Sequence, residues 1–248
     1  MQGSASLPVR DARNLADVHR HIAACTLCRD QLDPEKAPRR EESVAAQTRI
    51  FIVGQALARD TQRITGVPYF YPDGRLGSSG RSLEEFLRIV GATLYPPVAV
   101  EVESGTIPPA EPGYSPVYSS DIVQCFPGRK GAGDRFPVAV ARRCLEQGYL
   151  AREISLVRPA LILLLGAKVA DRFWRHFAGS PPPFRRLRDG IETVTRDRRP
   201  FVVQVEGRPY SVIPLIHPSG QTTGVFRSLV RDNTALRGVI ERTLKETQ

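Results

Sequence analysis

Long hydrophobic runs are absent from this sequence. The longest is the stretch ALILLL at residues 160–165, which has the length of a buried β-strand and is far shorter than the roughly 20 residues of a membrane-spanning helix. The first residues, MQGSASLPVRDARN, also lack an apolar segment behind a basic start, so we expect no secretory signal. These absences predict a cytoplasmic protein with no membrane partner.

Cysteine is scarce as well, with four residues in 248. Two disulfides are disfavoured in a cytoplasmic chain, so metal ligation or simple burial is the better interpretation. Cys25 and Cys28 form a C-x2-C pair, and Cys125 and Cys144 flank a loop rich in glycine, proline and arginine. All four can converge on one zinc ion or one iron–sulfur cluster, and their spacing does not separate the two. In the alternative interpretation, Cys125 and Cys144 are core residues and the C-x2-C pair is incidental.

Positive charge, in contrast, is in excess, and the formal net charge is +9. An excess of this size fits a polyanionic partner such as DNA, because phosphate contacts release condensed counterions. Arginine-rich composition can also follow nucleotide bias in a genome, so charge alone does not identify the partner. The candidate phosphate contacts are Arg129, Lys130 and Arg135 beside the cysteines and the stretch 185–188, for which a solvated basic face is the alternative.

Apolar periodicity predicts strands that alternate with helices. The expected strands are residues 49–53, 117–123, 160–165, 201–205 and 210–216. The expected helices are residues 15–22, 82–90, 138–157, 166–177 and 228–244, and the stretches 104–116 and 179–200 are expected to be exposed. This alternation favours an α/β protein with an open three-layer α/β/α sheet. We expect one domain over residues 1–248, with an N-terminal helical arm over residues 1–47.

Three loops follow the carboxyl ends of predicted strands, where ligands bind in such sheets. The first begins GQALA at Gly54, a residue type that allows another group to approach the backbone closely. The second leads into Cys125. The third carries His217, Pro218 and Ser219, where proline restricts the turn and serine can bond a phosphate. A histidine in such a turn is an unusual core residue, so a functional role is favoured.

The order of these parts resembles the iron–sulfur branch of the uracil-DNA glycosylase superfamily, its families 4 and 5. The shared features are C-x2-C, a strand ending in GQALA, G-x-P-Y, a strand leading to a cysteine, a second cysteine in a helix, an apolar strand ending in LG, and HPS. The resemblance implies a central four-stranded parallel sheet between helices. It also implies a structural [4Fe-4S] cluster on the four cysteines. The implied activity is monofunctional hydrolysis of the N-glycosidic bond of uracil, or of another deaminated base, in DNA during base excision repair. We expect a monomer.

The resemblance assigns the first two loops to water and base binding. Gly54, Gln55 and Ala56 begin the stretch 54–58, which matches the motif that activates water. Gln55 and Leu57 depart from the family pattern, and Asp60 lies in the same loop. Tyr69 aligns with the aromatic residue that stacks on the flipped base. Phe70 is adjacent and is a second candidate for that role.

The resemblance also assigns the catalytic groups. His217 matches the histidine that bonds uracil O2 as negative charge builds there. Asp73 is the closest match to the carboxylate that supports the sugar cation and the water, although a residue before glycine can serve only a turn. Asp121 is the second candidate for that carboxylate. It falls where the family has an asparagine that bonds the base edge, which leaves the choice of base open.

Smaller roles and alternatives complete the prediction. Ser219 is expected to bind phosphate, and Gln221 is the candidate wedge that fills the vacated base stack. Lys130 is the lysine placed near these loops, and we assign it to the cysteine site, so no lyase step is expected. One alternative is a nucleic-acid-binding relative that has lost or changed its activity, which the GQALA motif and Asp121 keep open. The other is a zinc-stabilised nucleotide-binding protein of unrelated chemistry.

Overall fold

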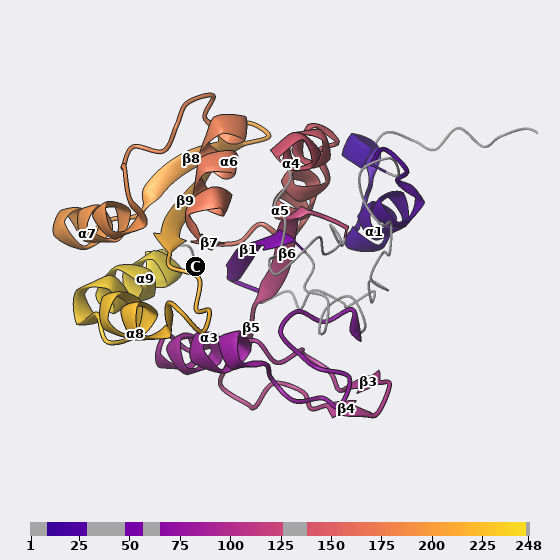
Figure 1. Ribbon diagram of the computed structural model, residues 1–248, viewed down its shortest axis with the longest axis horizontal. Coiled ribbons are helices and arrows are strands. Elements are labelled where there is room, and N and C mark those ends of the chain that lie inside the picture. Colours follow the sequence, from indigo (N-terminus) through magenta and orange to yellow (C-terminus); the bar gives the residue numbers. More distant parts are fainter. Residues whose placement is uncertain (1–8, 29–47, 57–64, 126–137, 247–248) are drawn as a thin grey trace, which may run out of the picture.

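The centre of the protein is a five-stranded sheet with strand order β6-β1-β7-β9-β8 (Figure 1). The computed structural model describes residues 9–28, 48–56, 65–125 and 138–246. Four neighbouring strands are parallel, namely β6 (Tyr118–Val123), β1 (Ile50–Ala56), β7 (Leu161–Leu165) and β9 (Arg208–Leu215). At one edge, β8 (Phe201–Val205) pairs with β9 in the antiparallel direction. The predicted α/β class and parallel sheet are confirmed, with one strand more than the four expected.

Helices cover both faces of this sheet, which makes the three predicted layers (Figure 1). One face packs against α3 (Ser78–Ile89), α7 (Leu187–Asp197) and α9 (Thr234–Glu246). The opposite face packs against α4 (Val138–Glu146), α5 (Tyr149–Val157) and α6 (Ala167–Phe177).

Strand periodicity explains the two cores, because successive side chains of a strand point to opposite faces. On β1, Ile52 packs on the α3 side, whereas Phe51 and Val53 pack on the α5 side. All five residues of β7 are buried, because this central strand is covered on both faces. The apolar run at residues 160–165 therefore reflects the position of β7 in the middle of the sheet.

The N-terminal arm packs on the α5 side of the molecule. A 3-10 turn (Val9–Asp11) leads to α1 (Leu15–Ala24), which begins after Asn14, whose side chain accepts a hydrogen bond from the Asp17 amide. Val18, Ile22 and Tyr149 of α5 form a small apolar cluster that holds the arm in place. The remaining elements are β2 (Ala92–Thr93), β3 (Val100–Val102), β4 (Gly105–Ile107), β5 (Ser115–Pro116), α8 (Thr223–Phe226) and a π-helix (Arg227–Arg231).

Four local expectations are corrected by the structure. The helix expected over residues 138–157 is two helices, because Gly148 adopts a left-handed φ of 78° between α4 and α5. The stretch 104–116 contains β4 and β5, and the closing helix is divided into the π-helix and α9. The stretch 179–200 contains α7, whose Ile191 and Val194 join the core.

Within the described ranges, none of the helices combines the length and the apolar character that crossing a bilayer requires. This agrees with the absence of long hydrophobic runs in the sequence.

We predict that α7 is an integral part of the fold, despite its basic and proline-rich surroundings. The side chain of Ile191 is 1% exposed. We expect Ile191→Ala to lower the unfolding free energy by about 2 to 5 kcal/mol, because the substitution leaves a cavity in the core. Val202→Ala is the matched control, since this β8 side chain is 64% exposed and should change stability by less than about 0.5 kcal/mol. Equal effects in urea denaturation would contradict the packing of α7.

Candidate active site

The candidate site lies at the carboxyl edge of the four parallel strands. Pairing places Asp121 of β6 directly beside Gly54 of β1, and Leu165 of β7 beside Leu215 of β9. The loops that follow all four strands therefore emerge at one edge, where open α/β sheets bind ligands. The sequence analysis identified three of these four loops.

The Asp121 carboxylate lies against the backbone of Gly54. A Cβ atom added to Gly54 would stand 2.2 Å from Asp121 Oδ1 and 3.4 Å from its Cγ, so only glycine leaves room for this side chain. Asp121 is 6% exposed, and it points to the α3 face of the sheet, because it pairs with Gly54. Glycine at the strand end thus makes room for a carboxylate, and an ionised carboxylate only accepts hydrogen bonds.

Tyr69 lies near this carboxylate and adopts a left-handed backbone conformation, with φ of 71°. Such a φ is uncommon for a large residue and marks positions that the surroundings impose. Gly80 of α3 allows it, since a Cβ there would meet the Tyr69 Cβ at 2.8 Å, and the Gly77 amide donates to the Tyr69 carbonyl at 2.8 Å. Burial raises the pKa of the Tyr69 phenol, and the charge of Asp121 raises it further.

His217 enters the same edge from the loop after β9. Its Cβ lies 3.7 Å from the position that a Cβ would take on Gly166, the residue that follows β7. The Gly166 amide also donates to the Leu215 carbonyl at 2.8 Å, which joins the two strand ends. Asp121 thus lies beside Gly54 of β1, and His217 lies beside Gly166 after the neighbouring strand β7. The two side chains therefore occupy adjacent parts of one sheet edge.

Thr222 orders the His217 loop, and the sequence analysis did not single it out. Its hydroxyl donates to the His217 carbonyl, and the Ser219 hydroxyl lies 2.8 Å from it. The Ser219 amide also donates to the His217 carbonyl at 2.8 Å. The HPS turn is therefore closed by its own hydrogen bonds. The signal in the sequence was the pair of threonines at positions 222 and 223, because hydroxyl side chains three or four residues beyond Ser219 can bond the backbone of the turn.

All four cysteines line one cavity between α1, the end of β6 and α4. Ile22, Val123 and Val140 supply apolar walls, and each cysteine is half-buried. The Gln124 amide donates to Cys144 Sγ at 3.3 Å. Burial raises the pKa of the Tyr149 phenol, and a hydrogen bond to Cys25 and the neighbouring sulfurs raise it further. These residues fit a group held by four thiolates.

Four thiols are the donor type that zinc ions and iron–sulfur clusters both use. Among the residues that the structure describes, which include all four cysteines, no three His, Cys, Asp or Glu side chains are grouped to hold one metal ion. A zinc ion needs all its ligands about 2.3 Å from one centre, whereas in a [4Fe-4S] cluster the four cysteines bind a wider body. The donor set is therefore that of a tetra-thiolate zinc site or of a [4Fe-4S] cluster.

The sequence that forms this site also matches a known protein family. Residues 42–236 match the model of the uracil DNA glycosylase superfamily, a span that contains Gly54, Asp121 and His217. The chain belongs to the uracil DNA glycosylase superfamily. Cys25 and Cys28 lie outside the matched span, so the match does not by itself select a branch. No curated protein matched the chain in a sequence search.

Membership supports a glycosylase-type hydrolase that acts on DNA. The remaining residues that the sequence predicted for the site differ in their positions and exposure. Gln55 and Ala56 end β1 and are half-buried. Ser219 belongs to the HPS turn, and Gln221 is exposed at the tip of the same loop. Asp60, Arg129, Lys130 and Arg135 lie outside the described residues.

Asp73 is held by a turn at the surface. The Gly74 amide donates to the Tyr71 carbonyl at 2.9 Å, and the Asp73 carboxylate accepts from the Arg75 amide at 3.0 Å and from Arg75 Nε at 2.7 Å. The hydrogen bond from the Arg75 side chain lowers the pKa of Asp73. The turn interpretation accounts for these contacts, and the catalytic role of Asp73 stays a prediction.

Phe70 belongs to the hydrophobic core. Its side chain has no exposed surface and packs edge-on against Tyr95 with ring centroids 5.2 Å apart. The prediction that Phe70 contacts a base is therefore corrected, since a ligand cannot reach this ring without opening the core. Tyr69, in contrast, is partly exposed and lies near Asp121.

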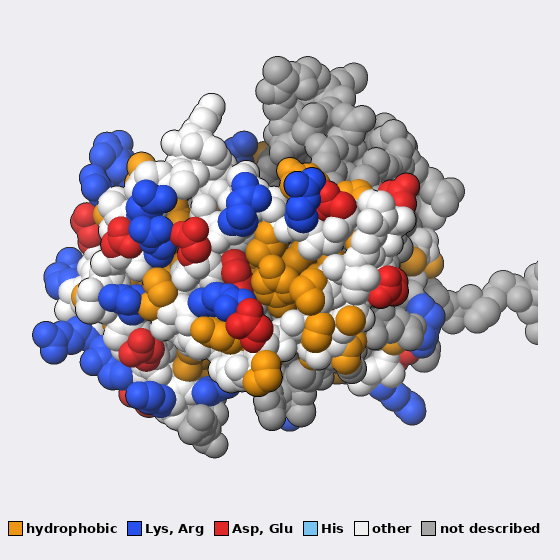
Figure 2. Space-filling view, turned by 90° about the horizontal axis from the view of Figure 1, so that it is seen from below, with side chains coloured by type: hydrophobic (Ala, Val, Ile, Leu, Met, Phe, Trp, Pro, Cys, Tyr) orange, Lys and Arg blue, Asp and Glu red, His pale blue; other side chains and the backbone are white. Residues whose placement is uncertain are grey.

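The surface of this superfamily member carries mixed charge. Figure 2 shows basic side chains gathered at the end of the molecule that carries α7 and α9, with acidic ones among them. Arg188 pairs with Glu192 at 3.6 Å, and the Arg186 amide donates to Asp189 at 3.0 Å. These contacts favour the solvated-face interpretation of the stretch 185–188. Lys168 is exposed in the first turn of α6, just beyond Gly166, and the sequence analysis missed it.

We predict that Gly54→Ala displaces the Asp121 carboxylate. The new Cβ cannot share space with Asp121 Oδ1, so we expect a loss of about 1 to 3 kcal/mol in unfolding free energy and a loss of base release of at least about tenfold. Gly238→Ala is the control, because nothing lies within 4 Å of its added Cβ in α9, and it should stabilise the fold slightly. Wild-type base release by Gly54→Ala would contradict the close approach.

Proposed function

We propose that this protein is a monofunctional DNA glycosylase that hydrolyses the N-glycosidic bond of uracil or of another deaminated base. The observation that supports it best is the Asp121 carboxylate lying over Gly54, next to Tyr69, at the sheet edge that His217 also reaches. Superfamily membership supports hydrolysis of a glycosidic bond in DNA, and the choice of uracil is our own proposal.

The target nucleotide must leave the DNA stack before any of these residues can act on it. The Tyr69 ring offers a surface on which the flipped base can stack, and the imposed backbone of Tyr69 holds that ring in one place. Stacking on an aromatic side chain is tolerant of base identity, because every base has a π-face. Selection among bases therefore falls to the groups that meet the base edge.

His217 is the proposed donor to the departing base. Negative charge builds on a base oxygen as the glycosidic bond breaks, and a positioned donor stabilises that charge in the transition state. The hydrogen bonds that Thr222 and Ser219 make around the His217 carbonyl hold the backbone from which the imidazole extends. Holding this backbone rigid limits the reorganisation that the reaction requires.

Asp121 is the proposed base-edge residue and the leading candidate for the carboxylate that supports the sugar cation. A carboxylate accepts hydrogen bonds and donates none when ionised. The hydrogen-bonding edge of uracil presents one N–H between two carbonyl oxygens, which a carboxylate can satisfy only in part. Hypoxanthine presents an N–H beside a C–H, which places one fewer oxygen against Asp121. Asp121 therefore favours hypoxanthine relative to uracil when compared with an asparagine at the same place.

Cys25, Cys28, Cys125 and Cys144 are proposed to hold a [4Fe-4S] cluster. When bound, such a cluster supplies a rigid covalent link between the chain segments that provide its thiolates. The position of all four cysteines around one cavity supports this assignment. The proposed role is structural, and the reaction is assigned to Asp121 and His217.

We predict that Asp121→Asn shifts base preference towards uracil. With oligonucleotides that carry uracil, hypoxanthine or xanthine, the ratio of uracil to hypoxanthine release should rise about tenfold, because an amide can donate to a base carbonyl. Asp73→Asn is the matched control, since its carboxylate is engaged by Arg75, and it should leave that ratio unchanged.

Two results would contradict these assignments. An unchanged ratio in Asp121→Asn would remove Asp121 from the base edge, and loss of release only in Asp73→Asn would make Asp73 the catalytic carboxylate. No release of any of the three bases by the wild type would refute the glycosylase proposal.

Borohydride treatment of the wild-type reaction should trap no protein–DNA adduct, as expected without a lyase step.

We also predict that the purified protein is brown and carries about four iron atoms per chain. Cys144→Ser should lose most of the iron, because one thiolate is replaced by a poor iron ligand. Elemental analysis of both proteins measures this directly. Zinc in place of iron would contradict the proposed cluster and favour the tetra-thiolate zinc alternative.

A further inference from the structure

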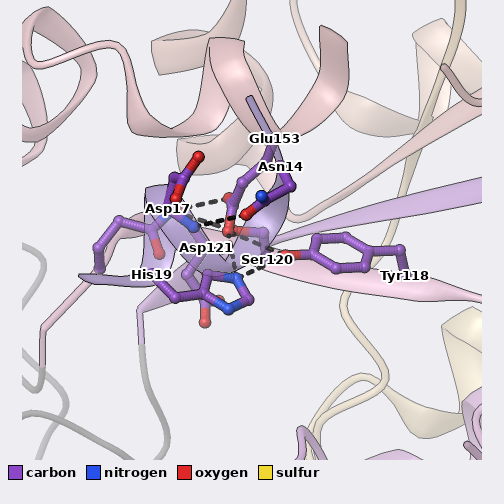
Figure 3. Close-up of polar contacts among 8 residues, drawn as sticks. Asn14, Asp17, His19, Tyr118, Ser120, Asp121 and Glu153 are labelled. Carbon is purple, nitrogen blue, oxygen red and sulfur yellow. Dashed lines mark hydrogen bonds and ion pairs between the residues drawn. The ribbon is translucent and has the colours of Figure 1, made fainter. Parts of the chain in front are cut away.

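Glu153 of α5 is completely buried, and polar side chains surround its carboxylate (Figure 3). The Tyr118 hydroxyl donates to Oε1 at 3.0 Å, and the Ser120 hydroxyl donates to Oε2 at 2.5 Å. His19 Nε2 lies 3.4 Å from Oε1, and Gln124 Nε2 donates to Oε2 at 3.5 Å. A buried carboxylate is costly unless it is paired and hydrogen-bonded, so a network this complete indicates a specific use.

The members of this network come from the segments that lead to Cys25 and Cys125 and from the helix that follows the Cys144 helix. His19 lies on α1, which ends at Cys25. Tyr118, Ser120 and Gln124 belong to β6 and to the residue that precedes Cys125. Glu153 lies on α5, which follows the Cys144 helix after the Gly148 break. Glu153 thus bonds to α1 and β6, which lead to Cys25 and Cys125, and the backbone amide of its partner Gln124 donates to Cys144 Sγ at 3.3 Å.

The same network also lies behind the proposed base pocket. Tyr118 and Ser120 pair with Phe51 and Val53 of β1, so they point to the α5 face of the sheet. Asp121 lies between Ser120 and Ile122, which both face α5, and its own side chain points to the α3 face. Gln124 strengthens the link, because its Nε2 donates to Ser120 Oγ at 3.0 Å and to the Asp121 carbonyl at 2.5 Å.

The side chain of His19 is also placed for this contact. It is 9% exposed, and Nε2 lies 3.0 Å from the Tyr118 hydroxyl. The described residues provide no hydrogen-bond partner for Nδ1. The polar contacts of the imidazole therefore all go to the Glu153 network, and they tie α1 to β6 and α5.

We propose that Glu153 is a positioning residue that sets the relative places of the four cysteines and of the Asp121 strand. This inference rests on the proposed function for its link to base release, whereas its link to the cysteines does not. A negative charge held at the junction of α1, β6 and α5 selects one arrangement of the segments, because any shift leaves the charge unsatisfied. Outer-shell groups of this kind hold metal ligands in place.

The test compares Glu153→Gln with Glu84→Gln. Glu84 of α3 is a matched control, since it is 7% exposed and accepts hydrogen bonds from Arg88 Nε at 2.7 Å, Thr93 Oγ1 at 2.8 Å and the Leu94 amide at 2.7 Å. Both variants keep the size of the side chain and remove a buried carboxylate, but Glu153 contacts α1 and β6, which lead to Cys25 and Cys125, whereas Glu84 bonds to Arg88, Thr93 and Leu94. Urea unfolding measures the general loss of stability in each variant.

The readouts are the rate at which a chelator removes iron from the folded holoprotein and the visible circular dichroism of the bound iron. Glu153→Gln should lose iron at least about tenfold faster than the wild type and should change the spectrum, since outer-shell changes typically cost 10- to 100-fold in metal affinity. Glu84→Gln should resemble the wild type in both. A wild-type rate in Glu153→Gln, or the same acceleration in both variants, would overturn the proposal.

Failure of the proposed cofactor can be distinguished from failure of this inference. If the wild type carries no iron, the cluster assignment is wrong, and the same variants are compared by the rate at which a thiol reagent modifies their cysteines. Faster modification in Glu153→Gln than in Glu84→Gln would still support the positioning role. Equal rates in the two variants would overturn it.

Discussion

The contact between the Asp121 carboxylate and Gly54 constrains the rest of the candidate site. It requires glycine at position 54 of β1, because a Cβ there would stand 2.2 Å from the carboxylate oxygen. It requires β6 and β1 to be parallel and in the observed register, because a shift by one residue would turn Asp121 to the opposite face.

Strand β6 therefore serves two faces with opposite chemistry. On one face it presents Asp121 to the proposed base pocket, and on the other it donates from Tyr118 and Ser120 to the buried Glu153. Burying a carboxylate opposes folding, and mutual hydrogen bonding offsets that cost. The gain is a defined position for the strand, which the proposed chemistry needs, because small displacements at a reacting centre reduce rates strongly. The four cysteines add a further constraint where β6 ends.

Much of the fold could be predicted from the sequence, because it depends on local patterns. The apolar run at residues 160–165 identified the central strand, and HPS identified the loop after β9. The antiparallel β8 was expected as a strand, but strand periodicity does not say which neighbour it joins. Helix α7 was missed because arginine and proline dominate its surroundings, although Ile191 and Val194 have helical spacing. The break at Gly148 depends on one left-handed residue.

The candidate site was less predictable, since it depends on contacts between distant residues. Sequence order grouped the cysteines correctly into one cavity, and Asp121 and Gly54 were both identified. Their contact was not predicted, because it follows from strand register. His19 and Tyr118 are 99 positions apart, and no local pattern connects them. Phe70 is buried and Tyr69 is partly exposed because the backbone turns sharply at Tyr69. The types of these two residues do not predict such a turn.

The central claim is that β6 presents Asp121 to a base that has left the DNA stack. A crystal structure of the protein with an oligonucleotide that contains a non-cleavable deoxyuridine analogue tests this claim most directly. We predict that the flipped base stacks on Tyr69, with its edge within hydrogen-bond distance of the Asp121 carboxylate and an oxygen facing His217. A base bound away from Gly54, or an Asp121 side chain that makes no contact with it, would contradict the account.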